Sequence, residues 1–166
     1  MMRGRFLLAV LSALLVSGCG FQLRGEATLP PEMDRTQMIV NDEYSTLARR
    51  VRIMLERNGV EFVGAEQATA ILEIPQNEVV TEVLTIADNA RAREYRVTYT
   101  VQFRLTDADG RDLIGWQTLR QSREISFDEQ QILASSREQE YLRDELAETM
   151  AQLLVARLES LYVTQG

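Results

Sequence analysis

Apolar residues recur on a helical period in two segments of this chain and on a strand period between them. In residues 41–58 one apolar stripe has the spacing of a single helix face, and its members are Tyr44, Leu47, Ala48, Val51, Met54 and Leu55. Asn41 or Asp42 is expected to cap the start of this helix, and Gly59 suits the left-handed residue that follows a helix end. We therefore predict an amphipathic helix over residues 41–58.

A second helical stripe lies near the C-terminus and consists of Leu142, Leu146, Met150, Leu153, Leu154, Leu158 and Leu161. Before it, Ser135 and Ser136 are followed three residues later by Glu138 and Gln139, which is the capping-box spacing at a helix start. We predict a long C-terminal helix that begins near these serines. Residues 127–134 favour a helical turn of their own.

Strand patterns fill the region between the two helices. Residues 36–40, 69–75 and 78–87 are rich in β-branched and apolar residues and predict short strands, with Pro75 marking a strand end or an edge. The clearest alternation is in residues 95–105, where the odd positions are apolar and the even positions are Arg96, Thr98, Thr100, Gln102 and Arg104. One face of that strand is expected to be core and the other to be wet.

A hairpin and an irregular return strand follow. Residues 107–110, DADG, predict a turn with Gly110 in the left-handed position. In residues 112–127 the apolar positions then change parity. Ile114 and Trp116 are even-numbered, whereas Leu119, Ile125 and Phe127 are odd-numbered. A β-bulge near Gly115 reconciles them, because one extra residue turns the following side chains to the opposite face.

The order of elements is strand, helix, several strands and helix. Each amphipathic helix must bury one face, and a sheet with one apolar face provides the cover. The pattern predicts an α+β fold, a two-layer sandwich with both helices packed on one face of a mixed, mostly antiparallel sheet. We assign residues 35–166 to this single domain.

The N-terminus has the pattern of a secretory leader. Arg3 and Arg5 precede the apolar run of residues 6–16, which is too short to cross a bilayer as a helix, and small residues follow it. We expect residues 1–18 to be a signal peptide.

Cys19 changes the kind of leader that is expected. Residues 16–19, VSGC, resemble the bacterial lipobox, in which the cysteine is acylated and becomes the new amino terminus. Acyl chains on Cys19 anchor a protein to a membrane without spanning it, and residues 19–34 then form a tether. Gly20, rather than Asp, favours sorting to the outer membrane. The alternative is a free cysteine in an uncleaved leader.

Composition excludes several classes of function. The 166 residues carry 18 basic and 25 acidic side chains, a net charge of −7, which argues against the broad basic face of a nucleic-acid-binding protein. The chain has no histidine and one cysteine, so Ser-His-Asp and Cys-His triads, the usual zinc sites and a disulfide cannot be built.

Carboxylate pairs are the remaining candidates for catalysis. Asp107 and Asp109 lie in a predicted turn whose chemistry already accounts for them, and Glu138 and Glu140 are two residues apart, so they face different sides of a helix. We expect no catalytic residue, no metal site and no cofactor apart from the covalent lipid on Cys19.

Five stretches carry a resemblance to a known family: CGFQLRG at the expected mature start, RNGV at residues 57–60, EYRVTYTV at 94–101, SFD at 126–128 and SREQE at 136–140. Together, and in this order, they resemble the LPS-assembly lipoprotein family LptE. The resemblance implies a non-catalytic outer-membrane lipoprotein that plugs the LptD barrel, helps it to assemble and assists transport of lipopolysaccharide to the outer leaflet. The implied location is the periplasmic face of the outer membrane or the barrel lumen.

The resemblance also implies where lipopolysaccharide is contacted. Basic residues near the turn before the 95–105 strand and near the start of the last helix have this role in the family, which indicates Arg91, Arg93 and Arg137 here. Guanidinium groups suit lipid A phosphates because they bind phosphate oxygens in pairs. The alternative is that each is an ordinary solvated arginine.

A second function remains open from the sequence. A small periplasmic lipoprotein that serves as accessory subunit of another outer-membrane assembly or lipid-trafficking machine has the same leader, size and α+β composition. Similarly, the polar face of the 95–105 strand suits the wet lumen of a large barrel, but it equally suits an ordinary solvated sheet. The identity of the barrel partner separates these hypotheses.

Overall fold

A computed structural model describes residues 29–86, 92–126 and 132–165 of the chain. Its elements are η1 (Pro31–Asp34), β1 (Arg35–Val40), α2 (Thr46–Arg57), β2 (Glu61–Phe62), β3 (Ala70–Ile86), β4 (Ala92–Asp107), β5 (Asp112–Ser126) and α3 (Ile132–Gln165). The strands form one sheet in the order β2-β1-β3-β4-β5. β1 is parallel to β2 and β3, whereas β3, β4 and β5 are antiparallel to one another.

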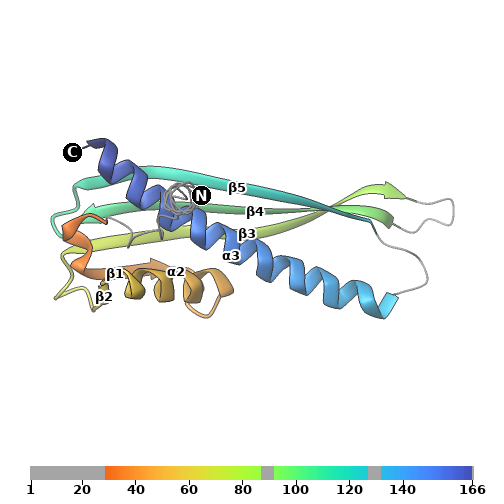
Figure 1. Ribbon diagram of the computed structural model, residues 1–166, viewed down its shortest axis with the longest axis horizontal. Coiled ribbons are helices and arrows are strands. Elements are labelled where there is room, and N and C mark those ends of the chain that lie inside the picture. The colour runs from red at the N-terminus through yellow and green to blue at the C-terminus, as the bar shows by residue number, and fades with distance from the viewer. Residues whose placement is uncertain (1–28, 87–91, 127–131, 166) are drawn as a thin grey trace, which may run out of the picture.

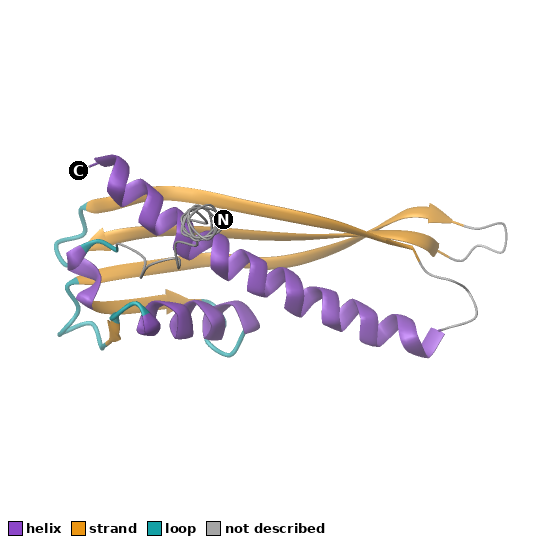
Figure 2. Cartoon of the chain, in the orientation of Figure 1, coloured by secondary structure: helices purple, strands orange, loops and turns teal. Residues whose placement is uncertain are grey.

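Both helices lie on the same side of the sheet (Figures 1 and 2). This confirms the predicted two-layer α+β sandwich with a mixed, mostly antiparallel sheet. The three strands β3, β4 and β5 are much longer than β1 and continue past its end (Figure 1). The helices therefore cover only part of a long, three-stranded ribbon.

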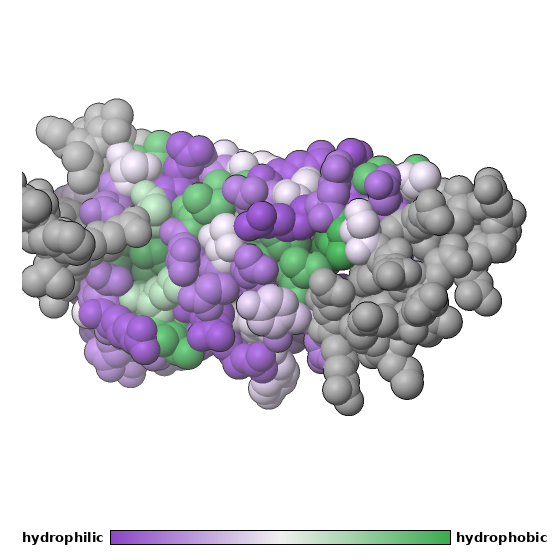
Figure 3. All heavy atoms as spheres, turned by 45° about the vertical axis from the view of Figure 1, so that its right-hand side comes forward, coloured by the Kyte–Doolittle hydropathy of each residue, from purple (hydrophilic) through white to green (hydrophobic). Residues whose placement is uncertain are grey.

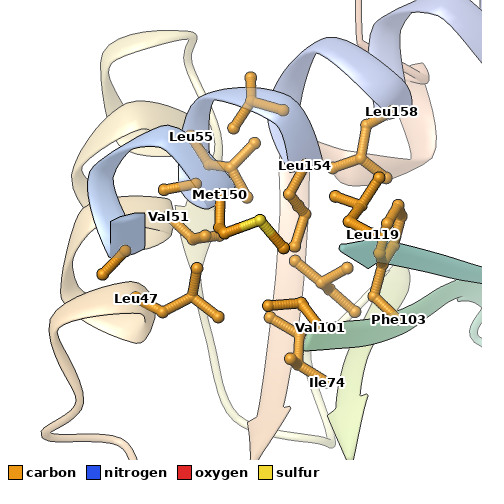
Figure 4. Packing of buried hydrophobic residues seen from close by; sticks show 14 of the residues in the cluster. Leu47, Val51, Leu55, Ile74, Val101, Phe103, Leu119, Met150, Leu154 and Leu158 are labelled. Carbon is orange, nitrogen blue, oxygen red and sulfur yellow. The ribbon is translucent and has the colours of Figure 1, made fainter. Parts of the chain in front are cut away.

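The hydrophobic core lies between the helices and the sheet (Figure 4). Helix α2 contributes Leu47, Val51 and Leu55, α3 contributes Met150, Leu154 and Leu158, and the strands contribute Leu72, Ile74, Val101, Phe103 and Leu119. Met33 of η1 is also fully buried, so the last residues of the segment that we assigned to the tether pack against the domain. Removing one of these large side chains leaves a cavity, which is why such cores are sensitive to truncation.

Helix α2 starts later than the pattern suggested. Its N-cap is Ser45, whose Oγ accepts a hydrogen bond from the backbone N–H of Ala48 at 3.2 Å. The predictions that Asn41 or Asp42 caps the helix, and that Tyr44 belongs to its apolar stripe, are wrong, since Tyr44 lies before the helix and is 83% exposed. Gly59 has φ = 90°, which confirms the predicted helix stop.

Strand β3 replaces two predicted strands. Residues 69–75 and 78–87 were expected to be separate, but β3 runs without interruption from Ala70 to Ile86. A shift in its register with β4, between Glu73 and Gln76, accommodates Pro75. Pairing with β1 ends one residue before this proline, at Ile74, so Pro75 stands at an edge, as predicted.

The predicted bulge in the return strand is confirmed. β5 pairs Gln117 with Phe103 and Ile114 with Leu105, so three steps on β5 match two on β4 around Gly115. The extra residue brings Ile114, Leu119 and Ile125 to the same buried side despite their different parity. Of the helical turn predicted over residues 127–134, residues 127–131 lie outside the described residues and residues 132–134 belong to α3.

Helix α3 begins before the predicted capping serines. It starts at Ile132, so Ser135 and Ser136 lie inside the helix, and the prediction that they mark its start is wrong. The leucine stripe is largely buried as expected, with Leu153 as an exception at 37% exposed.

Candidate functional site

The sheet has one face that neither of the two described α-helices covers, which we call the open face. It carries the even-numbered residues of β4 and their cross-strand neighbours on β3 and β5, including Glu73, Glu78, Val80, Glu82, Thr118, Arg120, Ser122 and Glu124. The odd-numbered residues Val97, Tyr99, Val101, Phe103 and Leu105 are all buried on the helix side. The structure thus confirms the predicted core and polar faces of this strand.

Charges on the open face are matched across strands. The guanidinium of Arg96 binds a carboxylate oxygen of Glu124 through Nε at 3.2 Å and Nη2 at 2.6 Å. This hydrogen bond, followed by the charges of Glu124 and Glu82, raises the pKa of Arg96 above its ordinary value. Next along the strands, Thr98 and Ser122 share a hydrogen bond of 3.1 Å, and Thr98 is almost fully buried despite its place on this face.

A denser cluster lies on the open face beside the hairpin turn. Arg104 donates from Nε and Nη2 to Glu73, with the shorter distance 2.8 Å, and its guanidinium carbon lies 4.7 Å from the centre of the Trp116 ring. Trp116 is nevertheless 47% exposed. Tryptophan and arginine are both enriched at surfaces where proteins bind one another, and here the two stack.

Both carboxylates of the hairpin turn form contacts within the turn itself. Asp107 accepts hydrogen bonds from the backbone N–H groups of Asp109 and Arg111, and it also pairs with the Arg111 guanidinium at 2.8 Å. The backbone N–H of Arg111 is the main reason that the pKa of Asp107 lies below its usual value. Asp109 binds the other side of Arg111 at 2.8 Å. These contacts give the Asp107 and Asp109 pair a structural role in the turn.

On the helix side, a chain of hydrogen bonds joins the sheet to the start of α2. The hydroxyl of the buried Tyr99 donates to Asn77, the amide of Asn77 donates to Ser45, and Ser45 caps the helix. Burial raises the pKa of Tyr99 to about 12, and the charge of Asp144 adds to the effect. The network holds β3, β4 and α2 at one point near the middle of the molecule.

The two helices are also tied to each other by charge. Arg50 of α2 pairs with Glu148 of α3 at 2.8 Å, and Thr46 donates to Asp144 at 3.0 Å. Among the residues that Figure 3 colours by hydropathy, hydrophilic ones predominate, with hydrophobic residues in patches between them. No group of acidic or cysteine side chains that could hold a metal ion occurs among the described residues.

A family model described as lipopolysaccharide-assembly, LptE, matches residues 36–158, which include all five strands except Arg35, all of α2 and most of α3. The chain belongs to the LptE family. The match confirms the resemblance inferred from the sequence.

Named relatives of this LptE-family chain support the same conclusion. It is 32% identical to the LPS-assembly lipoprotein LptE of Yersinia pestis (strain Pestoides F) over 161 residues, which cover 96% of this chain and 77% of that protein. It is 30% identical to the protein of the same name from Photorhabdus laumondii over 155 residues, or 92% of this chain and 83% of that protein.

Solved structures share the fold. An uncharacterized lipoprotein B from Nitrosomonas europaea superimposes with a TM-score of 0.69 at 26% identity and covers 85% of this chain and 91% of its own. The rare lipoprotein B from Shewanella oneidensis has a TM-score of 0.68 at 25% identity, covering 79% of this chain and 98% of its own. These similarities agree with the two-layer sandwich described above.

The residues that the LptE resemblance singled out are placed only in part. Arg93 lies at the start of β4, and Arg137 lies near the start of α3. Arg91 and Cys19 lie outside the described residues. Strand β4 and helix α3 both begin at the same end of the molecule, to the right in Figure 1. In the part of the chain that the structure describes, no helix has the length and apolar character needed to cross a membrane.

Sequence reasoning missed two features of this surface. The Arg104–Trp116 stack joins two strands, and Asn77 joins β3 to β4 and to the cap of α2. The proximity of these residues depends on register shifts that no local pattern reveals. The one available signal was that Trp116 is the only tryptophan in the chain and fell beside the predicted bulge.

Proposed function

We propose that this LptE-family protein is a lipoprotein held at the outer membrane by a lipid on Cys19, where it plugs the LptD barrel, helps it to assemble and assists transport of lipopolysaccharide to the outer leaflet. It acts through binding alone, without a catalytic group or a cofactor other than the lipid. The lipobox supports lipidation at Cys19, and a lipid there would hold the domain at the membrane, on the periplasmic face or inside the barrel lumen.

The observation that carries the proposal is the open face of the sheet. A plug must present polar groups to the wet interior of a large barrel without leaving buried charges unpaired. Here Arg96 pairs with Glu124, and Arg104 pairs with Glu73. The face is therefore polar, and these two arginines are paired with carboxylates. Such a face suits a wet lumen, and the family match supports the choice of partner.

The test is recovery of the partner. Tagged full-length protein, extracted from the outer membrane of its own host, is expected to co-purify with one large barrel protein, LptD, identified by mass spectrometry. Recovery of a different barrel would assign the protein to another outer-membrane machine, and recovery of none would reject the plug. Cys19→Ala should fold but appear in the soluble periplasmic fraction.

Lipopolysaccharide contact is proposed for Arg91, Arg93 and Arg137. Strand β4 and helix α3 begin at the same end of the molecule, and this placement supports the grouping (Figure 1). Replacing all three by glutamine is expected to weaken lipopolysaccharide binding by about tenfold, whereas Arg57→Gln, at the end of α2, should leave it unchanged. Equal binding by the two variants would remove these arginines from the site.

A further inference from the structure

Over its second half, strand β3 pairs with only one described strand, which leaves it an edge that we call free. Its pairing with β1 ends at Ile74, whereas its pairing with β4 continues to Ile86. The first residues past β1 are covered by the chain itself, because Asn41 donates to the backbone carbonyl of Pro75 and Asn77 donates to Ser45. From residue 78 onward, the side of β3 that faces away from β4 pairs with no described strand.

This edge is long enough for recognition. Residues 78–86 offer roughly 30 Å of extended backbone at about 3.3 Å per residue. Among the described strands, β5 and β4 make the main contacts with helix α3. Natural proteins usually shorten, cover or twist away an edge of this length, since it presents a row of backbone donors and acceptors to any extended chain.

The side chains along the edge are unusually apolar for an exposed strand. Val80 is 45% exposed, Val83 51% and Leu84 38%. These are three of the large exposed hydrophobic residues of the described structure, and they lie within five positions of one another. The other edge of the ribbon, β5, is interrupted by the bulge at Gly115 and carries charges of both signs. On β3 the register is regular from Glu78 to Val83, and its irregularities are confined to residues 83–86.

The charges along the edge favour a partner strand with basic residues. Glu78 and Glu82 flank Val80 on the open face, and both are exposed. An extended chain added to β3 would place its side chains directly opposite these residues, where opposite charges and apolar pairs are favourable. The fitting occupant is a strand with basic residues opposite the two glutamates and an apolar residue between them.

We propose that residues 78–86 of β3 bind an extended segment of the barrel protein by strand addition, which places the edge of the plug, and not only its face, in the interface. The inference rests on the proposed function for the identity of the partner. Wall strands of a closed barrel have no unpaired edge, so the segment must come from a loop or terminus that lies inside the lumen. Backbone hydrogen bonds then supply affinity and alternate side chains supply selectivity.

Hydrogen–deuterium exchange tests the pairing directly. In the free lipoprotein, amides of residues 78–86 that point away from β4 should exchange quickly, and in the purified complex the same peptide should slow by about tenfold or more. Peptides from residues 95–105 serve as the control, because these amides belong to a central strand in both states. A complex in which residues 78–86 exchange as fast as in the free protein would overturn the proposal while leaving the plug intact.

A matched pair of variants tests the side chains. Val80→Lys places a cation between Glu78 and Glu82 and should reduce the recovered barrel by about tenfold without lowering the melting temperature. Ile53→Lys changes a similarly exposed aliphatic residue, 40% exposed on α2, and should recover as much barrel as the wild type. Equal recovery by both variants would overturn strand addition, and so would a concentration-dependent dimer that Val80→Lys abolishes, since the occupant would then be a second copy. If the wild type itself recovers no barrel, the proposed function fails instead.

Discussion

The two halves of β3 have the same strand conformation and opposite surroundings. Between β1 and β4, Ala70, Leu72 and Ile74 are fully buried. Past the end of β1, Val80 and Val83 are apolar residues too, yet each is about half exposed. The difference shows that burial along this strand is decided by how far its neighbours extend, and not by the hydrophobicity of its own residues.

The contrast has a functional meaning. The first half is part of a closed core and contributes to stability, whereas the second half keeps apolar side chains and backbone groups at the surface, where a partner can use them. Asn77 lies at the boundary, where it accepts a hydrogen bond from Tyr99 of β4 and donates one to Ser45 at the start of α2.

The largest expected effect is the difference in stability loss when a side chain is truncated in each half of β3. Leu72→Ala removes a fully buried side chain and should lower the free energy of unfolding by about 3 kcal/mol, because a cavity adds to the lost burial. Val83→Ala, at 51% exposed, should change it by less than about 0.5 kcal/mol. Urea unfolding of both variants measures the difference, and similar losses would contradict the comparison.

The next effect concerns the boundary. Tyr99→Phe removes the hydrogen bond to Asn77 and should cost about 1 kcal/mol in unfolding free energy. Because burial raises the pKa of Tyr99 from 10.0 to about 12, the folded protein retains a proton that the unfolded chain loses. The contribution of neutral Tyr99 to stability is therefore fully present below pH 10 and is lost as the pH rises toward 12.

Tyrosinate absorbance provides the matching measurement. The wild type should show a component that titrates near pH 12, and Tyr99→Phe should lack it. The variant Tyr141→Phe, which changes a 68% exposed ring on α3, is the control and should retain both this component and the wild-type stability. Loss of the late component in both variants would show that Tyr99 is not its source.

A smaller effect compares two arginines of the open face. Arg104→Lys, opposite the first half of β3, loses the two-nitrogen contact with Glu73 and the stacking on Trp116, and should cost up to about 1 kcal/mol. Arg96→Lys, opposite the second half, changes an exposed pair with Glu124 and should have little effect on the urea midpoint. A larger loss at Arg96 would show that the second half is more tightly held than its exposure suggests.

The smallest effect is at the turn that precedes β5. The pKa of Asp107 is lowered in the folded protein, so its contribution to stability is present above its ordinary pKa of 3.8 and is lost as the pH falls through the folded value. Asp107→Asn should therefore be less stable at pH 7, and its unfolding midpoint should approach that of the wild type on acidification below pH 3.8. Parallel pH profiles for the two proteins would contradict this role.

Much of the fold was predictable because it depends on local side-chain period. The stripe around Val51 and Leu55 predicted α2, the alternation in residues 95–105 predicted the central strand, and the change of parity at Gly115 predicted the bulge. The helix starts were predicted poorly. Several residues near each start have suitable capping chemistry, and the tertiary contacts of Ser45, not its type, select it over Asn41 and Asp42.

The candidate surface was predictable only as a polar face. The sequence by itself determined which residues of β4 point away from the core, the presence of a lipobox at Cys19 and the resemblance to the LptE family, since these depend on spacing and on short motifs. Only the tertiary structure decided that Arg104 meets Trp116, that Asn77 joins three elements and that residues 78–86 form an open edge. The physical reason is that register and strand length are shared properties of neighbouring strands, so β1 determines the surroundings of β3 from thirty or more residues away along the chain.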